Sequence, residues 1–266
     1  MPLLGIKASL LNEFIAKAGG RGIFRNMTTR TVVEKMVLRD TNSFRGSYLE
    51  LLKRQGKCEG KETVVKEASV FVSHPWKGEF LYTVDAIMQT LERLKLPADG
   101  TFLWMDIFSL SQHGAFLLPS PSSSAVPASP TPSPSPSPSP SPQPRPPQWF
   151  SSALPALLAK MHHFLLVFQP DNPSLTLSRA WCIYEVHATT HATRPVTPPV
   201  TLAIPHDAYS KLFESIARKP GDLLAMVQRT PLFSSAQCTQ LADLTGITAY
   251  LTKQVMSRPM LNNVNF

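Results

Sequence analysis

The sequence predicts a doubly wound α/β domain, in which a mostly parallel sheet of four to five strands lies between two layers of helices. Two observations indicate this class. Strand-like apolar runs alternate with helix-like amphipathic segments through residues 67–220, as in sheets whose strands are joined by crossover helices. The runs are apolar at consecutive positions, as in Val70-Phe71-Val72, which is expected of strands covered on both faces.

The clearest local pattern is a β-α-β unit over residues 68–107. Residues 68–73 are expected to form its first strand and residues 101–107 its second. Between them, apolar residues from Gly78 to Leu96 recur at the spacing of an amphipathic helix, which Pro97 ends.

The second half of the domain continues the alternation. A helix is expected over 149–161, a third strand over 162–169, a helix that Ser178 could cap and that runs to about 191, a short fourth strand over 199–204, and a helix over 207–218. Beyond Gly221 no convincing fifth strand is found. With strands 1 and 3 adjacent in the order 2-1-3-4-5, the arrangement is a flavodoxin-like three-layer sandwich with helical flanks.

A Pro/Ser-rich insert interrupts the domain. Residues 119–147 hold 13 of the 26 prolines and have almost nothing apolar to bury, so residues 118–148 are expected to be disordered. The insert separates a first half, residues 67–117, from a second half, residues 149–220. A basic, partly helical N-terminal flank covers residues 1–66, and a helical C-terminal flank covers residues 221–266.

Composition excludes several classes of protein. The net charge is +8, and residues 1–60 hold eleven Lys/Arg against five Asp/Glu. Without a run of adjacent basic residues or a nucleic-acid motif, this charge is expected to be a solvated flank, and no nucleic-acid partner is predicted. Three widely spaced cysteines indicate a reducing compartment. No apolar run is long enough for a transmembrane segment, so a cytoplasmic location is expected. Residues 1–27 also resemble an organellar transit peptide faintly, although an ordinary amphipathic helix over 10–17 is the preferred interpretation.

Polar and aromatic residues follow three of the expected strands. Ligands of doubly wound sheets lie outside the carboxyl ends of the strands, so these residues are the candidates for a site. They are Ser73, His74 and Trp76 at and after the end of the first strand, Asp106 at the end of the second with Gln112 and His113 after it, and Arg179, Trp181, Cys182 and Glu185 after the third.

On these residues the sequence resembles the TIR domain family. Residues 68–74 are similar to its opening strand, residues 104–106 to its W-x-D box, and residues 181–186 to its W-C-x-x-E helix. The nearest resemblance is to a TIR-like group of algal and protist proteins with FVSHxW, WxDxFSxxQHG and RxWCxxE boxes. These boxes correspond to residues 71–76, 104–114 and 179–185.

The resemblance implies two alternative functions. Enzymes of the family cleave the nicotinamide–ribose bond of NAD, which here makes Glu185 the catalytic carboxylate, NAD the substrate, and no further cofactor necessary. The expected substrate-binding residues are Ser73, His74, Trp76, Asp106, Arg179 and Trp181, with an indole ring against a base and Arg179 or His74 against a phosphate. In the alternative, the domain is a non-enzymatic interaction module that associates with itself or with other TIR-like domains. The family's short glycine-bearing loop after the second strand is replaced here by the insert, a departure that favours the alternative.

Other chemistries are disfavoured. His74, Asp106, His113 and Glu185 could be imagined as metal ligands, but no metal-binding helix motif accompanies them, and no metal site is predicted. Cys182 is expected on the packed side of its helix, where a thiol stays protonated. No nucleophile elbow, P-loop or dinucleotide-binding glycine motif is present.

Overall fold

A computed structural model describes residues 3–56, 63–113, 154–172, 174–190, 199–218 and 247. The Pro/Ser-rich insert lies outside the described residues, as does the C-terminal flank apart from Ile247. The expectations of a disordered insert and a helical C-terminal flank therefore fall on residues that the structure does not describe.

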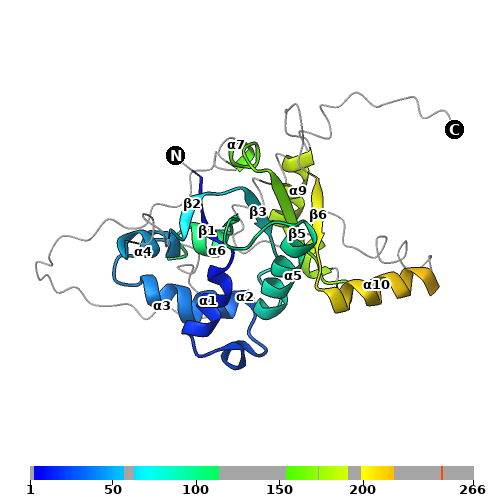
Figure 1. Ribbon diagram of the computed structural model, residues 1–266, viewed down its shortest axis with the longest axis horizontal. Helices are drawn as coiled ribbons and strands as arrows, with labels where there is room; N and C mark the ends of the chain where they lie inside the picture. The colour runs from blue at the N-terminus through cyan, green and yellow to red at the C-terminus, as the bar shows by residue number, and fades with distance from the viewer. Residues whose placement is uncertain are drawn as a thin grey trace, which may run out of the picture.

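Six strands form one mixed sheet in the order β2-β1-β4-β3-β5-β6 (Figure 1). The four strands expected from the sequence pair in parallel, with the first strand next to the second and the third. This arrangement confirms the predicted α/β fold with its mostly parallel sheet. The strands are β3 (Val70–Ser73), β4 (Phe102–Trp104), β5 (His163–Val167) and β6 (Val200–Ala203).

Two antiparallel strands extend the sheet beyond the four to five that the sequence predicts. β1 (Leu4–Lys7) pairs with β4 and with β2 (Val65–Glu67). Both lie in the segment that the sequence analysis treats as a flank. Neither was predicted, because each is too short to show an alternation of apolar residues. Their place also depends on distant pairing, that of β1 with β4 and that of β2 with β1.

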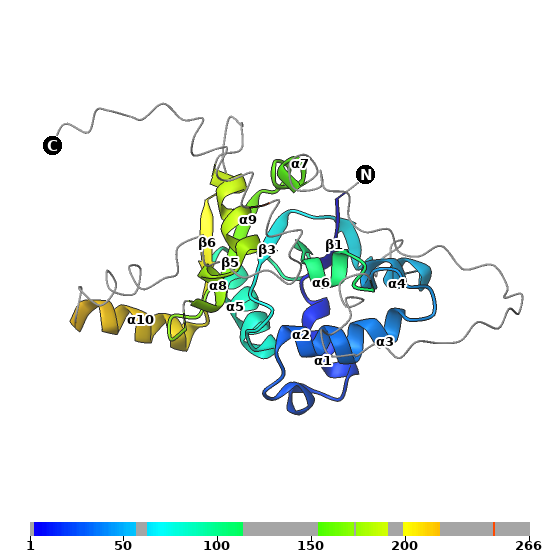
Figure 2. The ribbon, with the colours of Figure 1, turned by 180° about the vertical axis from the view of Figure 1, so that it is seen from behind.

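Helices of the N-terminal half cover one face of the sheet (Figures 1 and 2). The helix expected over residues 10–17 is observed there as α1, and the helix expected after the first strand is observed as α5. The elements are α1 (Leu10–Lys17), η1 (Arg21–Phe24), α2 (Thr29–Val32), η2 (Val33–Val37), α3 (Leu38–Thr41), α4 (Tyr48–Arg54) and α5 (Phe80–Arg93).

The opposite face carries α7 and α9 (Figures 1 and 2). The remaining helices lie in the connections at the strand ends or, in the case of α10, run away from the edge strand β6. The bounds of the helices after β4, including α7 and α9, are α6 (Asp106–Ser109), α7 (Leu154–Leu158), α8 (Ser174–Leu177), α9 (Ala180–Thr190) and α10 (His206–Arg218). Among the described residues, none of these helices, nor any of those before them, has the length and apolar character needed to span a bilayer.

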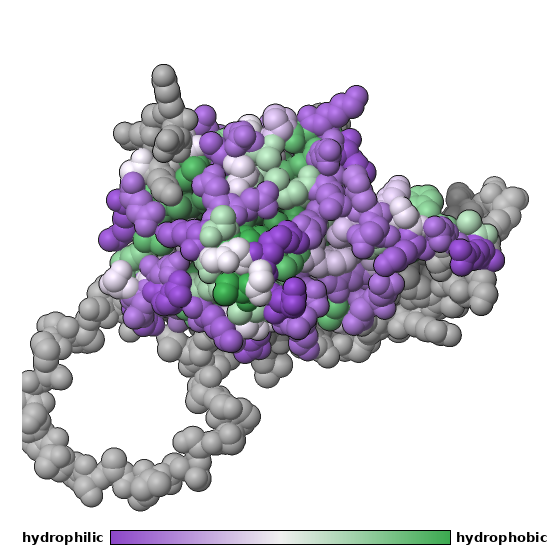
Figure 3. Space-filling view, turned by 60° about the horizontal axis from the view of Figure 1, so that its bottom comes forward, coloured by the Kyte–Doolittle hydropathy of each residue, from purple (hydrophilic) through white to green (hydrophobic). Residues whose placement is uncertain are grey.

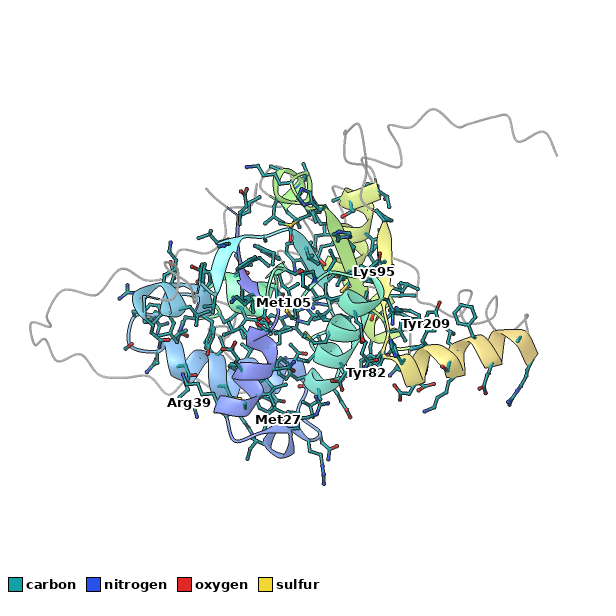
Figure 4. All side chains as sticks on the ribbon, viewed as in Figure 1. Met27, Arg39, Tyr82, Lys95, Met105 and Tyr209 are labelled. Carbon is teal, nitrogen blue, oxygen red and sulfur yellow. The ribbon has the colours of Figure 1, made fainter. Side chains whose placement is uncertain are left out.

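β3, β4 and β5 read as nearly unbroken apolar runs because both of their faces are buried. Val70 and Val72 pack with the helices of the N-terminal half, whereas Phe71 between them packs toward α7 and α9. On that second face, the ring of Phe71 stacks on Trp104 at 4.8 Å and on Phe164 at 5.3 Å. Met105, labelled near the middle of the molecule in Figure 4, packs on the first face. Apolar residues at consecutive positions therefore supply two separate cores.

Candidate functional site

The carboxyl ends of β3, β4 and β5 meet at one edge of the sheet because these strands are parallel neighbours. The loop after β3 contains His74 and Trp76, and α6 begins at Asp106 after β4. Arg179 directly precedes α9, in the connection that follows β5. The topology therefore brings segments about 30 and 70 residues apart in the sequence to one place, as the strand-end rule predicts.

Asp106 joins these segments. Its Oδ2 accepts a 2.9 Å hydrogen bond from the Trp76 indole Nε1 and lies 3.6 Å from Nη2 of Arg179. Its Oδ1 lies 3.6 Å from Nε2 of His74, which is beyond hydrogen-bonding distance. We call these four residues, His74, Trp76, Asp106 and Arg179, the edge cluster.

Arg179 makes three contacts within the edge cluster. It donates a hydrogen bond from Nη1 to the backbone carbonyl of His74, its guanidinium lies 5.3 Å from the ring centroid of Trp76, and its charge faces Asp106. Its side chain is 17% exposed. The sequence suggested a phosphate as its partner. In this conformation the guanidinium is already paired with a carboxylate and a carbonyl, which is how a largely desolvated cation is stabilised.

His74 and Ser73 are buried, with 2% and 1% exposure. Burial lowers the pKa of His74; the Asp106 carboxylate raises it, and Arg179 lowers it further. The imidazole therefore favours its neutral form near neutral pH. Both residues lie beneath the surface of the sheet edge, whereas Trp76 and Arg179 are half-buried at its rim.

Cys182 lies on the packed side of α9, as the sequence predicts. Its Sγ is 3.8 Å from the backbone carbonyl of His74, and burial raises the pKa of the thiol to about 12. At neutral pH the thiol is protonated and is a poor nucleophile.

Trp181 and Glu185 lie on α9, which begins directly after Arg179 of the edge cluster. Both are half-buried, and the Trp181 ring meets the Tyr184 ring edge-on at a centroid distance of 6.2 Å. Their separation of four residues puts both side chains on one face of the helix. Trp181 is thus neither fully buried in the core nor fully exposed.

Gln112 and His113 stabilise the end of the β4 connection. The Gln112 amide donates to the backbone carbonyls of Asp106 and Leu110, and His113 Nε2 lies 2.8 Å from the hydroxyl of Thr41. His113 is therefore bound to the N-terminal helices and is separate from the edge cluster. Within the part of the chain that the structure describes, no group of three or more His, Cys, Asp or Glu side chains could hold a metal ion.

A cavity of about 360 Å³ lies at the same sheet edge, between the start of α5 and the loop after β5. The Tyr82 hydroxyl donates to the Phe168 carbonyl at this place, and Figure 4 labels Tyr82 on the lower part of α5. Sequence reasoning did not find this cavity, because it considered the residues after Ser178 and passed over those directly after β5. The lining residues are Lys77, Gly78, Glu79, Tyr82, Gln169, Pro170, Asp171, Asn172 and Leu175.

Figure 3, in which the bottom of the molecule in Figure 1 comes forward, shows mostly hydrophilic side chains around a smaller apolar area.

Comparison of the chain with protein-family models, with curated proteins and with solved structures finds no match in any of the three. The fold and the sheet-edge geometry are therefore the basis for a functional assignment, together with the sequence resemblance described above.

Proposed function

We propose that this chain carries a TIR-like signalling domain that cleaves the nicotinamide–ribose bond of NAD, with Glu185 as the catalytic carboxylate. The proposal rests on the resemblance of three sequence boxes to the TIR family. The observed strand order supports it, because residues of all three boxes lie in the connections that follow neighbouring parallel strands.

The reaction needs little from the protein. Nicotinamide is a good leaving group, and its departure leaves an oxocarbenium-like ribose that a carboxylate stabilises electrostatically. In this proposal the Glu185 carboxylate faces the cationic ribose. Trp181, one helical turn earlier, supplies an aromatic surface for a base, and Trp76 could supply a second one from the loop after β3.

The observation that carries the proposal is the anchoring of α9. Arg179, directly before the helix, contacts both the backbone of His74 and the side chain of Asp106. These contacts hold the start of α9 against the carboxyl ends of β3 and β4, so Trp181 and Glu185 are carried by an element of defined position. A catalytic carboxylate requires such support, since small displacements cost much of the rate.

One observation favours the alternative, a non-enzymatic interaction module. Oδ2 of Asp106 is paired with both Trp76 and Arg179, and Ser73 and His74 are buried. A cluster of this kind can serve to hold the sheet edge together without binding any ligand. In the module, Trp181 and Glu185 would contact a partner protein or a second TIR-like domain.

The deciding experiment is incubation of the pure protein with NAD and measurement of free nicotinamide. Wild-type protein should release nicotinamide, whereas Glu185→Gln should fold normally and lose nearly all release, because the amide keeps the shape and removes the charge. Glu185→Asp should lose much of the activity, because the carboxylate retreats by about 1 Å.

Glu13→Gln is the matched control, because Glu13 is an exposed carboxylate on α1 and its loss should leave nicotinamide release unchanged. Wild-type protein that releases no nicotinamide, even when concentrated enough to self-associate, would exclude the enzyme and leave the interaction module. Release that survives Glu185→Gln would show that another residue does the chemistry.

A further inference from the structure

Both ring nitrogens of His74 face hydrogen-bond acceptors. The ring bonds to the backbone carbonyl of Val72. Because Nε2 has no hydrogen-bond partner, that bond comes from Nδ1. Nε2 lies 3.6 Å from Oδ1 of Asp106, an atom that is also buried without a partner. A neutral imidazole carries a single N–H, so neither neutral tautomer can donate to both acceptors.

The imidazolium would satisfy both acceptors, but its surroundings oppose the charge. His74 is 2% exposed, and a buried cation loses its hydration. Arg179 adds a second positive charge, because it contacts the same carboxylate and the His74 carbonyl. Hydrogen bonding therefore favours the added proton, and burial together with Arg179 disfavours it.

We propose that His74 is a buried proton-binding site that controls how firmly Asp106 holds the start of α9. Asp106 provides one negative charge for two cationic partners, the permanent guanidinium of Arg179 at Oδ2 and the titratable imidazole of His74 at Oδ1. Coupling between two such sites is reciprocal. Because Arg179 disfavours protonation of His74, protonation of His74 weakens the contact of Arg179 with Asp106 by the same free energy.

The other groups around His74 agree with this assignment. Asp106 faces it from α6 and Arg179 from the residue before α9, while Cys182 contacts its carbonyl from α9 and Glu185 lies near Cys182 on the same helix. The Cys182 thiol stays neutral throughout, since its pKa is about 12. Trp76 holds Asp106 through an N–H that does not titrate. Mild acid therefore loosens the link that Arg179 makes between Asp106 and α9.

The test is backbone amide exchange of residues 180–185 between about pH 7 and about pH 4.5, a range that lies mainly below the ordinary histidine pKa of about 6.5, because burial lowers the pKa of His74. Rates are corrected for the intrinsic effect of pH and compared with residues 84–91 of α5. In the wild type, protection of α9 relative to α5 should fall by about five-fold or more on acidification, the lower end of typical coupling between linked sites. The loss should be absent in His74→Gln and present in His206→Gln, whose histidine is exposed at the start of α10.

An equal loss of protection in His74→Gln, or no loss in the wild type, would overturn the proposal. A second measurement does not require the buried His74 variant to fold. The carbon-bound ring protons of His74, followed by NMR, should titrate at a higher pH in Arg179→Gln than in the wild type. An unchanged midpoint would show that the two cations are uncoupled and would equally overturn the proposal. Neither measurement depends on the NAD cleavage proposed above.

Discussion

Asp106 shows at the scale of single residues how a sheet edge is held together. Its carboxylate contacts Trp76, Arg179 and, at longer range, His74. Each of the four was a candidate from sequence because each lies at the end of a predicted strand or after it. What sequence could not show is that the polar groups pair with one another. A guanidinium with little solvent around it needs a carboxylate, and Asp106 supplies one from the end of β4, on the far side of β3 from β5.

Trp104 allows a direct test of packing at this scale. It is 5% exposed and its ring stacks on Phe71 at a centroid distance of 4.8 Å. Trp104→Ala should therefore lower the free energy of unfolding by roughly 3–5 kcal/mol, the usual range for deleting a buried large aromatic. Urea denaturation measures this change. A loss below about 1 kcal/mol would mean that this face of β4 is not packed as described.

At the scale of elements, β1 depends on a close approach of two backbones. A Cβ atom on Gly5 would lie 2.4 Å from the carbonyl oxygen of Leu103 in β4 and 2.9 Å from the Cβ of Ala68. Real Cβ atoms do not come so near a backbone oxygen. Glycine at this position is thus a condition for β1 to join the sheet beside β4.

Gly5→Ala should accordingly destabilise the protein by about 1–3 kcal/mol, the usual cost of overpacking. Gly22→Ala is the matched control, because a Cβ at Gly22 meets nothing within 4 Å and should change stability by less than about 0.5 kcal/mol. The two variants are compared by their midpoints of urea denaturation, provided that the dependence of the unfolding free energy on urea concentration is the same in both. Equal midpoints for Gly5→Ala and Gly22→Ala would mean that β1 does not pair with β4 in solution.

At the scale of the whole molecule, the buried histidines His74 and His113 and the half-buried His163 make stability depend on pH. Burial is the leading cause that lowers the pKa of His74, His113 and His163. The folded state then binds fewer protons than the unfolded state at a pH below the ordinary histidine value of about 6.5. Their contribution to stability is fully present above that value and is lost as the pH falls toward their lowered values.

The free energy of unfolding should therefore decrease from about pH 8 to about pH 5. Urea denaturation at several pH values measures the slope. His74→Gln should reduce the slope, while His206→Gln, which removes an exposed histidine, should leave it unchanged. A stability that stays level over this range would contradict the burial of these side chains.

Burial and pairing across the sheet also explain which features sequence could anticipate. α1 and α5 were predicted with nearly their observed bounds, because amphipathic spacing is a local signal. β3, β4 and β5 were predicted because apolar residues at consecutive positions require two covered faces. β1 and β2 were missed because strands of four and three residues are too short to show a periodic pattern of apolar residues. The residues of the sheet-edge cavity, such as Tyr82 and Asp171, were missed because nothing local distinguishes them.

By itself, the sequence determined the class of fold, the positions of the parallel strands along the chain and the candidate residues at their ends. These depend on periodicity and on the rule that parallel strands share one carboxyl edge. Only the tertiary structure decided that Arg179 pairs with Asp106, that His74 is buried with both nitrogens facing acceptors, and that Gly5 lies against Leu103. Such contacts join residues up to about a hundred positions apart, and the energies of hydrogen bonds, ion pairs and close packing depend on distances that no local pattern encodes.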